Sequence, residues 1–117
     1  MFPFENLEVY KKAFELNRKV YFLLKERKNI ASYVRDQLGR ASLSVMLNIA
    51  EGSGRYSNKD RRNFFVIARS SAFECSAIID FLFSANEIEE QERIFFNEGL
   101  EEISRILFVM IKNLEKK

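Results

Sequence analysis

The sequence predicts an all-α protein that folds as an antiparallel, up-down-up-down four-helix bundle, with residues 1–117 forming one domain. One proline and four glycines leave few residues for β-turns in a chain of 117 residues. Apolar residues recur three and four positions apart in four successive segments. Ser, Ala and Gly recur with the same spacing between residues 37 and 74, and small residues let two helices approach closely. The connections are short, so neighbouring helices should be antiparallel.

The first helix is expected over about residues 7–26, where two apolar stripes lie side by side. One stripe contains Leu7, Tyr10, Phe14, Tyr21 and Leu24, and the other contains Val9, Ala13, Leu16, Val20 and Leu23. Asn6 is the expected N-cap, because its side chain can accept a hydrogen bond from an unpaired amide of the first turn.

The second helix is expected over about residues 31–52, with a main apolar stripe of Val34, Leu38, Ala41, Val45 and Ile49. Beyond Leu43 the segment is apolar on nearly every face, which predicts burial on more than one side. Gly52 and Gly54 should end the helix, because glycine adopts the left-handed conformation without a Cβ penalty.

The third helix should begin after Ser57, whose hydroxyl forms an S-x-x-D capping box with Asp60. Its expected apolar stripe is Phe64, Ala68, Ser71, Cys75, Ile78 and Leu82. The fourth helix should begin near Glu89, and its stripe is Phe96, Leu100, Ile103, Leu107, Met110 and Leu114. We expect it to end at Lys116 and Lys117, where cations match the negative end of the helix dipole.

The residue types exclude several kinds of chemistry. The chain has no histidine, so Ser-His-Asp and Cys-His catalytic arrangements and Glu-x-x-His di-iron sites cannot form. Cys75 is the only cysteine, and it cannot supply the thiolates of a histidine-free zinc site or an intramolecular disulfide. We therefore expect no metal, no cofactor and no enzyme activity.

The sequence also predicts a cytoplasmic location. A single cysteine suits a reducing compartment. The first five residues, Met1-Phe2-Pro3-Phe4-Glu5, lack the basic region and the apolar run of a signal peptide. No apolar run approaches the roughly 20 residues that a membrane-spanning helix needs, so a membrane is not an expected partner.

Charged and apolar residues are both distributed in a way that suggests self-association. The net charge is +2, but residues 1–28 carry seven cations against four acids and residues 85–117 carry five against eight. These charges are either ordinary solvated helix faces or complementary surfaces for partners. Several large apolar residues lie outside the expected stripes, and exposed apolar patches usually mark interfaces, so we expect a homo-oligomer. They are Phe73, Phe81, Phe83, Phe95 and Phe108.

Polar residues of the central hairpin have two interpretations. In the first, Asn48 and Glu51 tie the hairpin through backbone hydrogen bonds and Arg55, while Arg40 or Arg69 neutralises Glu74, because a partly buried charge needs a partner. In the second, Asn48, Glu51 and Arg55 line a cleft for a ligand or a partner.

A basic cluster is expected at the tip of the same hairpin. Arg55, Lys59, Arg61 and Arg62 can neutralise phosphates, and Tyr56 among them can stack on a base. The alternative is an ordinary solvated helix start, although cations near a helix N-terminus oppose its dipole. On the first helix the cluster is extended by Lys11, Lys12, Arg18 and Lys19.

The same residues carry a resemblance to a known family. The chain resembles the bacterial four-helix-bundle proteins encoded in intervening sequences of 23S ribosomal RNA genes, which were once labelled ribosomal proteins. The most specific motif is Asn48-Ile49-Ala50-Glu51-Gly52 followed, after one unspecified position, by Gly54-Arg55. Further matches are Phe4-Glu5-Asn6-Leu7, Val9-Tyr10, Gln37-Leu38, Arg40-Ala41, Ser44-Val45, Phe64, Ala68-Arg69, Ser71 and Glu74.

The resemblance implies a homo-oligomer, with a homopentameric ring as the familiar form. It also implies a similarity in fold to the accessory variability determinant of diversity-generating retroelements, which works with a reverse transcriptase and nucleic acid. Three positions depart from the family pattern, since Gly39 replaces an arginine, Met46 a proline and Ser70 a glycine. The loss of a cation at position 39 weakens the case for a nucleic-acid surface there.

Together these observations predict a non-enzymatic, homo-oligomeric bundle that associates with RNA through phosphate contacts. DNA or a partner protein is the other expected kind of partner. The alternative is a structural or protein-interaction module that recruits a partner protein through its apolar and charged faces. A small-ligand site or an enzyme at Asn48, Glu51 and Arg55 is the third hypothesis.

Overall fold

The structure, a computed structural model, describes residues 1–115 and contains helices but no strand over that range. A short 3-10 turn, η1 (Pro3–Asn6), precedes α1 (Glu8–Glu26), α2 (Ser32–Ser53), α3 (Asn58–Ser84) and α4 (Glu90–Glu115). The predicted four-helix bundle is confirmed, and each predicted helix boundary lies within about one residue of the observed one. Lys116 and Lys117, the expected end of the last helix, lie outside the described residues.

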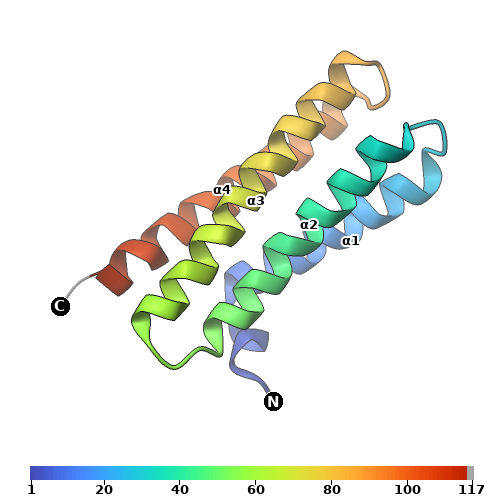
Figure 1. The fold of residues 1–117 in the computed structure, drawn as a ribbon. Coiled ribbons are helices and arrows are strands. Elements are labelled where there is room, and N and C mark those ends of the chain that lie inside the picture. The colour runs from blue at the N-terminus through green and yellow to red at the C-terminus, as the bar shows by residue number, and fades with distance from the viewer. Residues whose placement is uncertain (116–117) are drawn as a thin grey trace.

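The four helices run alternately up and down in an elongated bundle of 48 × 25 × 22 Å (Figure 1). The turn between α2 and α3, the N-terminal segment and the end of α4 lie at one end, which we call the hairpin end (Figure 1). The connections 27–31 and 85–89 lie at the opposite end. Among the four α-helices that lie side by side, the contact between α2 and α3 is the most extensive and that between α1 and α4 the smallest, whereas α1 and α3 lie diagonally across the bundle. None of the described helices is long and apolar enough to cross a membrane.

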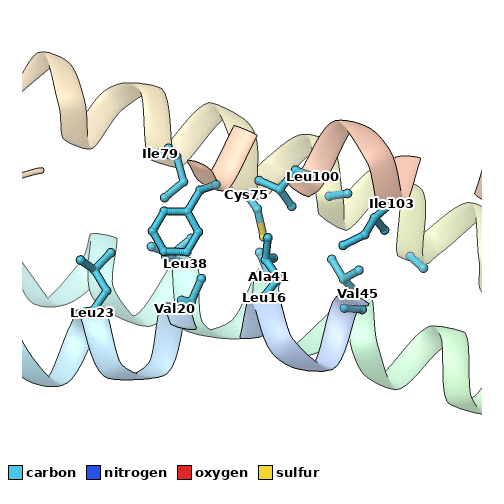
Figure 2. Close-up of a cluster of buried hydrophobic side chains, with 14 of the residues drawn as sticks. Leu16, Val20, Leu23, Leu38, Ala41, Val45, Cys75, Ile79, Leu100 and Ile103 are labelled. Carbon is cyan, nitrogen blue, oxygen red and sulfur yellow. The ribbon is translucent and has the colours of Figure 1, made fainter. Parts of the chain in front are cut away.

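The core runs along the whole bundle and receives side chains from all four helices. The stripe predicted for α2 is buried at all five of its positions. Figure 2 shows Cys75 of α3 among Leu16, Ala41 and Leu100, which come from the other three helices. Cys75 is 1% exposed, so the surrounding core shields its thiol from water.

In the other three helices, only some residues of the predicted apolar stripes are buried. In α1 the stripe from Val9 to Leu23 is buried, whereas Phe14 and Tyr21 of the other stripe are about half exposed. In α3 the predicted Ala68, Ser71, Cys75 and Leu82 are buried, but Phe65 and Ile79 are buried in place of Phe64 and Ile78, each one position later than predicted. Phe64 instead lies beneath a cation, with its ring centroid 4.5 Å from Arg55 Cζ. In α4 the stripe is as predicted up to Leu107, after which Ile111 is buried and both Met110 and Leu114 are only partly buried.

The ends of the helices show one correct and one wrong prediction. The Ser57 hydroxyl accepts a hydrogen bond from the Asp60 amide at 3.1 Å, so Ser57 is the N-cap of α3. Asn6 does not cap α1, because it is the last residue of η1 and Leu7 takes the N-cap position without a side-chain bond. Asn6 is part of the 3-10 turn that begins at Pro3, so it does not occupy the position directly before the first residue of α1.

Gly52 and Gly54 end α2 by a different mechanism from the expected one. Gly54 has a φ of −93°, and the described residues include no glycine with positive φ. A Cβ on Gly52 would lie 2.8 Å from Phe65 Cε1 and 2.9 Å from Phe64 Cβ. Gly52 is therefore required by the close approach of α2 and α3, as the small-residue pattern suggested for the hairpin as a whole.

Candidate functional site

The family-motif residues of α2 and α3 form a polar connection across the hairpin. Asn48 Nδ2 donates to the Ser44 carbonyl at 2.8 Å and to Ser44 Oγ at 2.9 Å. The Ser44 and Ser71 hydroxyls are 2.8 Å apart. Asn48 thus orients Ser44 toward the neighbouring helix, and Ser71, which is 8% exposed, is satisfied in the α2–α3 contact.

The turn at the hairpin end is held by its own arginines. Arg55 pairs with Glu51 at 3.2 Å and covers the Phe64 ring. Arg61 Nε donates to the Arg55 carbonyl at 2.7 Å, which closes the turn from the α3 side. Among residues 1–115, the bonds of Asn48 and Glu51 stay within α2 and its turn, and Arg55 makes the contacts with α3 that the first interpretation expected of the hairpin.

Glu74 does not pair with an arginine. Its carboxylate accepts a hydrogen bond from Gln37 Nε2 of α2, and within residues 1–115 no ion pair joins it to Arg40 or Arg69. Arg69 and Glu74 are five positions apart, so an α-helix directs them roughly 140° away from each other. Arg69 faces α4 instead, and its Nε donates to the Ser104 carbonyl at 3.2 Å and to Ser104 Oγ at 3.1 Å.

The predicted basic cluster is gathered at the hairpin end, but most of its cations have partners. Arg62 Nε binds Glu115 Oε2 at 2.7 Å and so joins the start of α3 to the end of α4. This hydrogen bond is the main reason why the pKa of Glu115 is lowered. Lys59 is exposed and forms no ion pair within the described chain, and the Tyr56 side chain is 100% exposed.

The cations of α1 do not extend this cluster into one surface, because α1 and α3 are diagonal in the bundle. Lys12 binds Glu102 of α4 at 3.3 Å, and Arg27 just after α1 binds Glu92 at 2.8 Å. The basic first helix and the acidic last helix therefore meet within the chain. Lys11 and Arg18 pair with acids one turn earlier on α1, at 3.6 and 3.4 Å, and Lys19 lines a hollow against α4.

A second cluster, which sequence reasoning missed, lies on the outer face between α3 and α4. The Arg69 guanidinium carbon is 4.8 Å from the Phe73 ring centroid and 5.1 Å from that of Phe108. These rings are 54% and 45% exposed, respectively. We call Arg69, Phe73 and Phe108 the aromatic platform. The spacing of Arg69 and Phe73, one turn apart, was the available signal, but Phe108 approaches only through the pairing of α3 with α4.

Several hollows lie between neighbouring helices, and three of them adjoin α4. One of about 320 Å³ lies beside the platform and is lined by Ala72, Phe73, Ser76, Leu100, Glu101, Ser104 and Arg105. Two more, of about 540 and 420 Å³, lie between α1 and α4 and share Phe95. In residues 1–115, no three acidic, cysteine or histidine side chains are grouped so that they could hold a metal ion.

Comparisons with known proteins agree with this architecture. The family model for 23S rRNA-intervening sequence proteins matches residues 5–109. The chain is also similar to a solved protein with unknown function from the S23 ribosomal protein family of Bacteroides thetaiotaomicron, with 26% sequence identity and a TM-score of 0.81. That similarity covers 89% of this chain and 98% of the other. No curated protein matches the sequence. Because the family model covers nearly the whole chain, this protein belongs to the 23S rRNA-intervening sequence protein family.

Proposed function

We propose that this protein is a non-enzymatic, homo-oligomeric helical bundle that associates with RNA through phosphate contacts at its hairpin end. The observation that carries the proposal is the gathering of Arg55, Lys59, Arg61 and Arg62 around the fully exposed Tyr56. Cations near the start of α3 oppose the positive end of its dipole, so they cost stability unless an anion approaches. Phosphates supply that anion, and Tyr56 offers a ring for stacking.

Homo-oligomerisation is supported by an apolar face that the monomer leaves uncovered. Phe14 and Tyr21 of α1 are 49% and 57% exposed, and Leu43 and Leu47 of α2 are 41% and 51% exposed. Tyr21 and Leu43 line a shallow hollow of about 260 Å³ between the two helices. Apolar patches of this kind are usually covered by another protein surface. A ring of copies, with a pentamer as the expected form, would hold several hairpin ends together. Weak contacts that are linked in this way bind tightly through avidity.

A protein-interaction module is the second candidate, because the groove between α1 and α4 has the form of a docking site. Its two hollows share the half-exposed Phe95, and charged side chains of both signs line them from each helix, with Lys12 and Glu15 on α1 and Glu98 and Arg105 on α4. An exposed ring within a charged groove would suit a partner helix that has an apolar face and charged flanks.

The test combines light scattering with fluorescence anisotropy of a labelled RNA over a range of salt concentrations. We expect a mass that is a multiple of 13.8 kDa and an affinity that falls steeply as salt rises. Lys59→Glu should weaken binding to all RNA sequences alike, because Lys59 has no ion-pair partner among residues 1–115 that the substitution would remove. The matched control is Lys28→Glu, which reverses an exposed cation at the opposite end of the bundle.

Two outcomes would count against the proposal. If the unaltered protein binds no RNA at low salt, the RNA function is wrong and the groove between α1 and α4 becomes the leading site. If Lys59→Glu and Lys28→Glu weaken binding equally, RNA association stands but the hairpin end is not the contact. A monomer mass at micromolar concentration would contradict oligomerisation alone.

A further inference from the structure

The aromatic platform lies on a line of cations that starts at the hairpin end. Lys59, Arg62, Arg69 and Phe73 follow one another on α3 at spacings that return to the same helix face. Lys112 of α4 joins this line, since its Nζ is 5.7 Å from the Phe108 ring centroid. From Lys59 to Phe73 the helix rises about 21 Å, which is long enough to accompany several nucleotides of an extended strand.

We propose that this α3–α4 face binds single-stranded RNA, with phosphates along the cations and an unpaired base stacked on the aromatic platform. The inference rests on the proposed association with RNA and adds a second contact to it, distinct from the hairpin end. It also states which form of RNA is bound, because an aromatic ring can stack on the face of a base only when that face is free of its neighbours.

The geometry of Arg69 makes the platform a preorganised contact. Its Nε is held by the Ser104 carbonyl and hydroxyl, and the guanidinium carbon lies about 5 Å from both rings. Within residues 1–115, neither terminal guanidinium nitrogen of Arg69 has a hydrogen-bond partner. These two nitrogens can donate together to a phosphate, since a guanidinium presents its donors as a rigid fork. Little side-chain entropy is then lost when the anion binds.

The hollow beside the platform is suited to a planar base. Its volume of about 320 Å³ is at the lower end of the range for small-ligand sites. Phe73 forms one wall, Ala72 and Leu100 are apolar lining residues, and Arg105 contributes a further cation. The Glu101 carboxylate would repel a phosphate in this hollow. It can accept a hydrogen bond from the amino group of a base, so the hollow favours the base over the phosphate.

Acids elsewhere on the line are already neutralised. Glu115 is bound by Arg62 at 2.7 Å and by Lys112 at 3.6 Å. Because Glu115 engages both Arg62 and Lys112, the cations of this face that have no ion-pair partner within residues 1–115 are Lys59, Arg69 and Arg105, and these three favour an anion. A second copy of this chain would need acidic residues opposite Arg69 to cover this face. An interface of that kind is one of the outcomes that the experiment below distinguishes.

The test uses anisotropy titrations of the full chain with a labelled single-stranded RNA and with a duplex of the same sequence. Phe73→Leu and Phe108→Leu keep apolar packing but remove the aromatic face. Each should weaken single-strand binding about tenfold or more while leaving duplex binding and the slope of affinity against salt unchanged. Phe73→Tyr should bind as well as the unaltered protein. The matched control is Tyr33→Leu, which removes an exposed ring from the start of α2, at the opposite end of the bundle from the hairpin end.

Each other outcome overturns the inference in a recognisable way. If the unaltered protein binds no RNA, the proposed function fails and this inference fails with it. If it binds RNA but the two leucine variants bind the single strand normally, only the platform is excluded. If the leucine variants retain helix content by circular dichroism but have a lower oligomer mass, the platform is an interface between copies of this chain.

Discussion

Gly52 lies where α2 meets the start of α3, and its missing side chain determines how closely the two helices approach. We expect Gly52→Ala to destabilise the fold by about 1–3 kcal/mol, because the new Cβ would lie within 3.0 Å of both Phe64 and Phe65. Alanine gains roughly 1 kcal/mol of helix propensity, which offsets only part of that cost. Urea unfolding measures the difference.

Gly39 supplies the matched control for this prediction. A Cβ on Gly39 would meet only Leu24 Cδ1, at the ordinary contact distance of 3.7 Å. Gly39→Ala should therefore stabilise the protein by up to about 1 kcal/mol through helix propensity alone. If both substitutions raise the urea midpoint, the close approach at Gly52 is not a constraint on stability.

Cys75 provides a second prediction at the level of single residues. Burial in the core, assisted by the nearby charge of Glu74, raises the pKa of the Cys75 thiol to about 12. The thiolate is the reactive form, so Cys75 should resist thiol reagents in the folded protein at mildly alkaline pH and react rapidly in concentrated urea. A colorimetric thiol assay follows both rates, and fast stoichiometric labelling of the folded protein would contradict the buried environment.

Among the elements, α3 depends on a local cap that can be tested directly. Ser57→Ala removes the acceptor of the Asp60 amide and should cost about 1 kcal/mol of unfolding free energy. Ser70→Ala is the control, because Ser70 lies exposed within the same helix. It should leave stability unchanged or raise it slightly. Equal losses from both changes would show that the serine at position 57 is not acting as a cap.

The pairing of α3 with α4 at the hairpin end predicts a dependence on pH. The hydrogen bond from Arg62 lowers the pKa of Glu115, so the folded state favours the carboxylate. Its stabilisation is complete above the pKa of Glu in the unfolded chain, about 4.3, and is lost as pH falls through the lower folded value. The effect should be small and salt-sensitive, since both side chains are partly exposed.

A double-mutant cycle with Arg62→Gln and Glu115→Gln isolates this interaction. We expect a coupling free energy at neutral pH that disappears in acid when urea unfolding is repeated there. A coupling that persists well below the folded pKa would exclude the ion pair as its origin.

For the whole molecule, Arg27 connects both loops at the opposite end of the bundle. Its Nη1 donates to the Glu87 carbonyl at 2.8 Å and its Nη2 to Glu92 Oε2 at 2.8 Å. Lysine cannot reproduce this fork, so Arg27→Lys should cost on the order of 1 kcal/mol of unfolding free energy. Thermal unfolding monitored by circular dichroism measures the loss. The neighbouring exposed Lys28→Gln is the control, and an equal effect there would mean that the bridge contributes nothing specific.

The packing of the first helix against the last explains part of the uneven charge distribution along the chain. The cations of residues 1–28 and the acids of residues 85–117 suggested surfaces for self-association. In the fold, Lys12–Glu102 and Arg27–Glu92 use part of this asymmetry to pair the first and last helical segments within one chain. The apolar face with Phe14 and Leu47 is therefore a stronger reason than charge to expect contacts between copies.

Much of the fold and only part of the candidate site could be predicted from sequence. The α2 stripe and the Ser57 cap depend on neighbours within a few positions, and both are confirmed. The α1 sequence carries two adjacent apolar stripes, and helical periodicity alone does not distinguish the one that is buried. Likewise, the residue types suggested an ion pair for Glu74, but helix rotation directs Arg69 to α4 and leaves Glu74 facing Gln37.

The number and order of the helices, their approximate bounds and the family motif were determined by the sequence alone, because periodicity and caps are local interactions. Only the tertiary structure decided why Gly52 is needed, since Phe64 and Phe65 reach it after α2 and α3 pack together. The same holds for the platform, where Arg69 meets Phe108 and Ser104 from α4. Contacts between residues so far apart in the chain depend on the rotation and depth at which two helices pack, which the spacing of residues within one helix does not specify.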